Sequence, residues 1–297
     1  MAEAWTARTE RSNRFLFVAI AWVARYLGRP AARTLLHCGV AYFMFAAPGA
    51  RRASRDYLRR VLDRRPRWRD SYRHLYTFAT VFLDRLFLVR DTGSRLRIDN
   101  HGVEAFRKCI GDKRGAIIMV SHLGSFEALR ALSGRRDDLT VRILMNWATG
   151  AKVNSVLERI DPGFADRVID TSTSDVDRVL KVKAALERGE MIGIMADRHH
   201  AGERTVDCRF LGAPAPFPLS PWLLAGILGA PVFLAFGLYR GGNRYDLYCE
   251  QFSDGLALPR AERMPRAQEY AQRYADRLAE HARHAPYNWF NFYRFWK

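Results

Sequence analysis

The chain has 297 residues, 48% of them apolar, which is enough for one large domain with a complete core or for two small ones. Lysine and arginine total 48 against 31 acidic residues, so the formal net charge is +17 and the expected partners are anionic: nucleic acid, acidic lipid headgroups or an acidic protein. The four cysteines are far apart, which argues against a zinc site or a disulfide framework and fits a reducing compartment: Cys38, Cys109, Cys208 and Cys249.

Two apolar stretches near the N-terminus are each too short to cross a bilayer. Residues 15–24 (FLFVAIAWVA) and 35–47 (LLHCGVAYFMFAA) contain ten and thirteen uncharged residues, whereas a spanning helix needs roughly 20 apolar residues. Arg25 and Arg29 follow the first stretch, where a signal peptide would have a small-residue cleavage site. The two stretches predict either helices that lie in one leaflet of a membrane or helices buried in the core.

An arginine-rich segment follows between Arg51 and Arg69, with nine arginines and two aspartates. Basic residues next to an apolar segment are typical of the cytoplasmic side of a membrane, where the headgroups are anionic. We therefore expect residues 1–50 to form membrane-associated helices and residues 51–297 to form the second unit of the chain. The basic run lies beside apolar helices instead of stacking aromatics, which argues against nucleic-acid binding.

From residue 115 onward, short apolar runs alternate with helical patterns. Strands are predicted over residues 115–121, 140–147, 167–172, 191–197, 231–240 and 244–252. Helices are predicted after Ser125, from Ser174 to Arg188 with Gly189 as the stop, after Ser220-Pro221, and along a stripe from Ala267 to Ala282. This alternation predicts an α/β fold with a mixed, mainly parallel central sheet flanked by helices, preceded by an apolar helical membrane anchor.

Charged and titratable residues lie directly after two of the predicted strands. His122 follows residues 115–121, and Asp197 and Arg198 lie at the end of the strand predicted over residues 191–197. Binding and catalytic sites of parallel sheets form at the carboxyl ends of the strands. We therefore expect a site at this edge of the sheet.

Glu127 lies five residues after His122, and on a loop that leads into a helix its carboxylate can point back at the imidazole. A carboxylate on one ring nitrogen leaves the other nitrogen free to take a proton from a hydroxyl. The spacing therefore predicts a general-base dyad. The alternative is a helix-capping glutamate beside an incidental histidine.

Other catalytic patterns are missing from the sequence, which has no G-x-S-x-G, no P-loop and no G-x-G-x-x-G. His199-His200 is not expected to bind a metal, because adjacent residues rarely bind one ion well. A histidine base without a serine or cysteine nucleophile favours direct transfer of an activated acyl group to a hydroxyl, with no cofactor. Donors expected for the oxyanion are backbone N–H groups near Gly124 and the guanidinium of Arg198 or Arg204.

The sequence VSHLGSFE (120–127) resembles the first block of the lysophospholipid acyltransferase superfamily, whose signature is His-x4-Asp/Glu. More closely, the chain resembles the bacterial lipid A late acyltransferases, the lauroyl and myristoyl transferases. The stretches that carry this resemblance are residues 195–221, 229–247 and 286–296 (PYNWFNFYRFW). The resemblance covers most of the chain, including the basic, apolar N-terminal segment.

The resemblance implies transfer of a fatty acyl chain from acyl carrier protein to a hydroxyl of a membrane glycolipid, such as a lipid A precursor, at the cytoplasmic face of the inner membrane. It gives His122 and Glu127 the roles of the dyad, and Asp197 and Arg198 match the charged pair after the next core strand. It assigns a shaping role in the acyl or acceptor pocket to Phe210, Leu211, Gly212 and Pro216. Acyl carrier proteins are acidic, so the +17 charge fits such a donor. An alternative from another class is a membrane-surface lipid-binding protein with an inactive dyad.

Overall fold

A sheet of seven strands forms the centre of the molecule. The computed structural model describes residues 20, 22–24, 26–90, 96–128, 139–147, 158, 163–172, 174–200 and 202–296. In order across the sheet, the strands are β1 (Arg97–His101), β9 (Arg244–Ser253), β8 (Val232–Gly241), β2 (Ala116–Val120), β5 (Met191–Met195), β3 (Val141–Met145) and β4 (Val168–Asp170). Strands β8 and β9 pair antiparallel and the other neighbours pair parallel. The predicted α/β fold with a mainly parallel sheet is confirmed.

Side chains of the central strands alternate between two hydrophobic cores, one on each face of the sheet. On β2, Ile117 and Met119 belong to the larger core, and Ile118 and Val120 to the smaller one. This period of two residues is the period of a strand, and burial on both faces explains why the strand is apolar throughout. The apolar run that ends at His122 is therefore fixed in the middle of the sheet, between β8 and β5.

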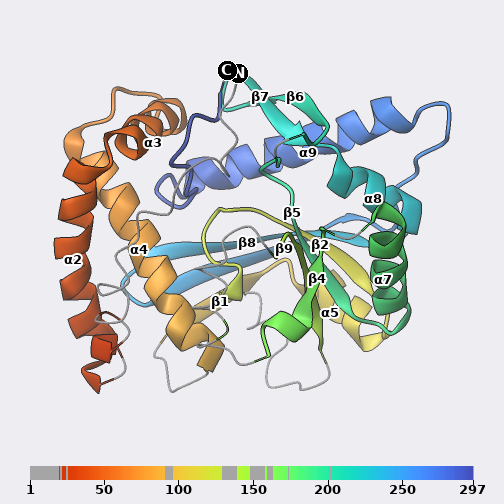
Figure 1. The fold of residues 1–297 in the computed structure, drawn as a ribbon, viewed down its shortest axis with the longest axis horizontal. Coiled ribbons are helices and arrows are strands. Elements are labelled where there is room, and N and C mark those ends of the chain that lie inside the picture. The colour runs from red at the N-terminus through yellow and green to blue at the C-terminus, as the bar shows by residue number, and fades with distance from the viewer. Residues whose placement is uncertain are drawn as a thin grey trace.

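The helices lie at the two ends and on the faces of this sheet (Figure 1). Helices α2 (Gly28–Ala46), α3 (Pro48–Val61) and α4 (Trp68–Arg90) stand together at one end, with α2 outermost. Helices α7 (Asp175–Glu187) and α8 (Ser220–Leu228) stand at the other end, and α9 (Arg263–His284) crosses above the sheet. Helix α5 (Glu104–Gly111) covers the smaller core, and the short 3-10 helix η3 (Ala165–Arg167) precedes β4.

Most of the predicted boundaries agree with the structure to within one or two residues. Ser174 caps α7 as expected, because its hydroxyl accepts a hydrogen bond from the N–H of Asp177 at 3.2 Å. Helix α8 begins one residue earlier than expected, with Leu219 as its N-cap, so that Ser220 is already helical. The helix predicted after Ser125 lies largely outside the described residues.

Strands β6 (Thr205–Phe210) and β7 (Ala213–Pro218) form a separate antiparallel hairpin that the sequence did not predict. Strand β7 has prolines at positions 214, 216 and 218, a pattern that reads as a loop. Proline lacks an N–H group and is tolerated only on an edge strand, where that side of the backbone needs no donor. Because the three prolines occupy alternate positions, they leave the intervening N–H groups of β7 free to pair with β6.

Helix α2 is part of the packed structure. It begins at Gly28 and continues through Arg29 and Pro30, the residues that separate the two apolar stretches. The Arg29 guanidinium donates two hydrogen bonds to the buried carboxylate of Asp84 on α4, at 2.6 and 2.8 Å. The Tyr245 hydroxyl on β9 donates a third to the same carboxylate, at 2.7 Å. Asp84 therefore joins α2 and α4 to the sheet.

Within the part of the chain that the structure describes, no helix has the length and hydropathy needed to cross a bilayer. The anchor that the sequence predicted before the α/β fold is thus unsupported as a spanning element. The predicted division at residue 50 falls inside the first turn of α3 and stays a prediction.

We expect Asp84→Ala to lower the free energy of unfolding by about 3–5 kcal/mol, because it leaves a largely buried guanidinium without its carboxylate. Denaturant unfolding followed by circular dichroism measures the change. The matched control is Asp56→Ala on α3, which removes partly exposed pairs with Arg59 and Arg60 and should cost about 1 kcal/mol or less. Equal effects of the two substitutions would contradict the role of Asp84.

Candidate active site

The loop that carries His122 leaves the carboxyl end of β2 and is held from two sides. On one side, the N–H of Ser125 donates to the carbonyl of Gly237 on β8 at 2.8 Å. Gly124 has a φ of +77°, and a Cβ atom there would lie 1.9 Å from that carbonyl oxygen. Only glycine fits this position, because both the backbone conformation and the close approach exclude a side chain.

On the other side, the loop pairs with the C-terminal tail. The N–H of Gly124 donates to the carbonyl of Asn288, and the N–H of Phe290 donates to the carbonyl of His122, both at 2.9 Å. Leu123 and Trp289 form an antiparallel bridge between these two hydrogen bonds. A segment from the far end of the chain therefore fixes the backbone of His122.

The partner of the His122 imidazole is Asp197, which follows β5, the strand next to β2. Nδ1–H of the ring donates to Oδ1 of Asp197 at 2.9 Å, and the backbone N–H of His122 donates to Oδ2 at 3.0 Å. The Trp289 indole N–H also donates to Oδ2, at 2.9 Å. Asp197 is completely buried, whereas 29% of the His122 side chain is exposed. Among the described residues, Nε2 of His122 makes no hydrogen bond, so this nitrogen is the one available to a substrate.

The electrostatics favour a neutral imidazole beside an ionised carboxylate. Burial lowers the pKa of His122 below its ordinary value of 6.5, and the positive charges of Arg198 and Arg85 lower it further against the opposing effect of Asp197. Burial alone would raise the pKa of Asp197, but its electrostatic interaction with His122, the charge of Arg198 and the hydrogen bonds from His122 and Trp289 lower it to about 2. At neutral pH the ring therefore donates through Nδ1 and presents a lone pair at Nε2.

The predicted contact between Glu127 and the imidazole is corrected by the structure. One oxygen of Glu127 pairs with Nε of Arg85 on α4 at 2.6 Å, and the other accepts a hydrogen bond from the Ser125 hydroxyl at 3.2 Å. The carboxylate turns toward α4 because that helix brings a cation to it. Glu127 thus balances the positive charge of Arg85, and that charge lowers the pKa of His122. Glu127 does not itself bind the ring.

The expectation of backbone donors near Gly124 is also corrected. The N–H groups of residues 123, 124 and 125 all donate within the protein, to Ser121 Oγ, to the carbonyl of Asn288 and to the carbonyl of Gly237. They are therefore not free to bind an oxyanion.

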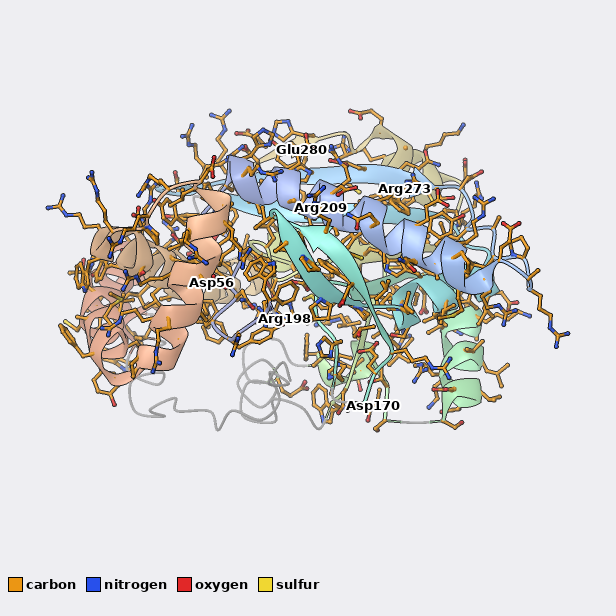
Figure 2. All side chains as sticks on the ribbon, turned by 90° about the horizontal axis from the view of Figure 1, so that it is seen from above. Asp56, Asp170, Arg198, Arg209, Arg273 and Glu280 are labelled. Atoms are coloured by element: carbon orange, nitrogen blue, oxygen red, sulfur yellow. The ribbon has the colours of Figure 1, made fainter. Side chains whose placement is uncertain are left out.

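Arg198 is the predicted donor that lies at the site. Its Nη2 donates to the carbonyl of Phe290 at 2.6 Å, and its guanidinium lies 5.3 Å from the ring centre of Tyr293. Among the residues that the structure describes, none bonds its buried Nε. In the view of Figure 2, Arg198 lies between α3 and the β6–β7 hairpin. Arg204 is exposed and precedes β6.

The remaining predicted residues lie in the β6–β7 hairpin. Phe210 is buried, and its ring centre lies 5.1 Å from that of Trp289. Gly212 occupies the turn with a φ of +86°, and Pro216 is buried in β7. Phe210 thus packs against Trp289, and the role of these residues in shaping an acyl or acceptor pocket stays a prediction.

Comparison with known proteins gives a family match over nearly the whole chain. Residues 4–297 match the family described as bacterial lipid A biosynthesis acyltransferase. A search of curated proteins finds no match.

We expect the imidazole of His122 to titrate below pH 6.5 and Arg198→Gln to raise its pKa. The sign follows from the charge: the guanidinium disfavours the imidazolium, so its removal stabilises the protonated ring. Titration of ¹⁵N-labelled histidine by NMR, with His122→Gln for assignment, measures both values. The control is Arg204→Gln, an exposed arginine whose loss should leave the titration unchanged. An unaltered midpoint in Arg198→Gln would show that Arg198 does not act on the ring.

Proposed function

The chain belongs to the bacterial lipid A biosynthesis acyltransferase family, and on that premise we propose that it transfers a fatty acyl chain from an acyl thioester to a hydroxyl of a membrane glycolipid, such as a lipid A precursor. The observation that carries this proposal is the hydrogen bond from Nδ1 of His122 to the buried carboxylate of Asp197. A ring oriented in this way, with Nε2 unbound and a depressed pKa, is suited to act as a general base near neutral pH.

The reaction proceeds in one addition and one elimination. Nε2 of His122 takes the proton of the acceptor hydroxyl as its oxygen attacks the thioester carbonyl. The new C–O bond gives a tetrahedral intermediate whose oxygen carries the negative charge. The C–S bond then breaks, and the proton on Nε2 passes to the leaving thiolate. Asp197 stabilises the imidazolium that exists between the two proton transfers.

Arg198 is the group that we assign to the oxyanion. Its guanidinium is close enough to lower the pKa of His122, and its buried Nε has an unused N–H. A fixed cation in a poorly solvated site lowers the energy of a developing negative charge more than water does. Backbone amides are the usual alternative, but those of residues 123–125 are already bonded.

We propose acyl carrier protein as the donor. The net charge of +17 favours association with an acidic protein. Helix α3 exposes Arg52, Arg55 and Arg59 on one side, spaced so that they share a face. Coenzyme A thioesters are also anionic, so the two donors must be compared directly in the assay.

The outward face of α2 supports binding to the inner membrane from its cytoplasmic side. Its exposed positions are Pro30, Thr34, His37, Cys38, Tyr42 and Phe45. None of them is a charged residue, and Phe45 is 74% exposed. A helix with such a face lies in the plane of the interface instead of crossing the bilayer, and tyrosine is favoured at headgroup depth. The arginines of α3 follow at once and suit anionic headgroups.

We expect His122→Ala and Asp197→Asn each to lower the rate of acyl transfer by roughly 100-fold or more, because one removes the base and the other its orienting charge. Glu127→Gln should lower it less, because Glu127 acts through Arg85. Transfer of a labelled acyl group from acyl carrier protein to membrane glycolipid gives the rate, and mass spectrometry identifies the product.

His101→Ala is the control for these variants, since His101 is exposed on β1, and it should keep the full rate. Absence of any transfer by the unaltered protein, together with lipid binding, would favour an inactive lipid-binding protein. A larger loss in Glu127→Gln than in Asp197→Asn would restore the His122–Glu127 dyad.

We expect Tyr42→Ser with Phe45→Ser to reduce binding to anionic vesicles by roughly tenfold or more, because the two rings lose apolar area buried at the interface. Flotation of the full chain at low and high salt measures binding. Deletion of residues 1–50 is unsuitable, because it removes Arg29 from Asp84. The matched control is Val176→Ser with Leu180→Ser, which alters two large exposed apolar residues of α7.

Charge reversal at Arg52 and Arg55 should weaken the same binding by about 1 kcal/mol per residue, and only at low salt. If the double serine variant of α2 floats as well as the control of α7, the membrane face lies elsewhere.

A further inference from the structure

Trp289 is the residue of the C-terminal tail that reaches the buried carboxylate of the site. Its backbone lies opposite Leu123, and its indole N–H donates to Oδ2 of Asp197 at 2.9 Å. The whole side chain is buried. Asp197 therefore has three donors: two from His122 and one from Trp289.

The indole is held from several elements at once. Its ring centre lies 5.0 Å from that of Tyr57 on α3, 5.1 Å from that of Phe210 on β6 and 4.9 Å from that of Phe295 in the tail. Rings at these distances and steep angles pack edge to face, an arrangement that restricts rotation. The direction of the indole N–H is thus fixed by its surroundings.

The main chain of Trp289 is fixed as well. Its carbonyl accepts a hydrogen bond from Nε2 of His74 on α4 at 2.8 Å, and Nδ1 of His74 bonds the Ser54 hydroxyl of α3 at 2.9 Å. Burial lowers the pKa of His74 to about 4, so the ring is neutral at pH 7. Nε2–H donates to the carbonyl, which can only accept, and Nδ1 accepts from the hydroxyl. Both ring nitrogens of His74 are therefore bonded, and the ring links α3 to the tail.

We propose that Trp289 is a positioning residue for the reaction, and that its indole N–H holds Oδ2 of Asp197 so that Oδ1 stays aligned with Nδ1 of His122. The carboxylate can rotate about its bond to Cβ. The two donors of His122 belong to one residue, so they move together with it and do not fix the carboxylate relative to the rest of the protein. A donor from an independent, rigidly packed side chain locks the pair in one geometry. The kinetic part of this inference depends on the proposed function, whereas its structural part does not.

Loss of the indole donor has a second, electrostatic consequence. A carboxylate that accepts fewer hydrogen bonds interacts more strongly with its remaining partner, here His122. It therefore stabilises the imidazolium more strongly, and the pKa of His122 rises. The other charged and titratable groups that face the pair are Arg198 after β5, Arg85 on α4 with its partner Glu127, Tyr274 on α9 and Tyr293 in the tail. None of them is altered by a change at Trp289.

The test is Trp289→Phe in the full chain, with Trp296→Phe as the matched control. Trp296 is buried in the same aromatic cluster, but its indole N–H donates to the carbonyl of Phe210 at 3.2 Å. We expect Trp289→Phe to lower kcat roughly tenfold, as loss of a hydrogen bond to a charged group does. The acid limb of kcat/KM and the NMR titration of His122 should both move to higher pH. Trp296→Phe should change neither pH dependence.

A second substitution separates the N–H from the ring. Benzothienylalanine at position 289 has the shape of tryptophan and lacks the donor, so it should reproduce the pH shift even if the phenylalanine variant folds poorly. Unchanged titration of His122 and an unchanged pH profile in this protein would overturn the proposal. If the unaltered protein transfers no acyl group, the proposed function fails, and the NMR titration alone decides the role of Trp289.

Discussion

The ionised carboxylate of Asp197, with no exposure to water, is the constraint on which the site depends. A buried charge is strongly unfavourable unless hydrogen bonds and an opposite charge replace the lost water. Here the donors come from His122, which follows β2, and from Trp289 in the tail. The requirement to satisfy one side chain thus holds together two adjacent strand ends and a distant segment. That same assembly leaves Nε2 of His122 exposed to a substrate and gives the ring a defined tautomer.

Helix α4 connects the outer helical layer to this site through side chains at several points along its length. Asp84 bonds Arg29 of α2 and Tyr245 of β9, Arg85 pairs with Glu127 after β2, and His74 bonds the carbonyl of Trp289. Each contact is buried or partly buried, so none is an interchangeable surface pair. Helix α2, whose outer face is uncharged, is therefore joined through α4 to the loop that carries His122. Because of these contacts, we do not expect the N-terminal segment to be removable without consequence.

The sequence predicted the position of the site better than its internal bonds. The rule that parallel sheets carry sites at strand ends located His122, Asp197 and Arg198, because apolar runs reveal buried strands. The rule could not show which of these side chains bond to each other. The spacing of five residues between His122 and Glu127 does not reveal that Arg85 of α4 pairs with Glu127. The indole of Trp289 was visible only as one ring in an aromatic cluster. Strands β1, β6 and β7 were missed, because exposed residues in β1 and β6 and alternate prolines in β7 hide the apolar pattern of a strand.

The pairing of the tail with the loop after β2 also fixes an order of events during synthesis. At the usual 5–20 residues per second, the ribosome needs roughly 8–30 seconds to go from His122 to Phe290. Over that interval Asp197 is made, but its indole donor on Trp289 and the tail partners of the loop, Asn288 and Phe290, do not yet exist. Helix α2, with its uncharged outer face, has by then long left the ribosome. The loop that carries His122 is therefore completed only once the tail has docked, long after α2 has been synthesised.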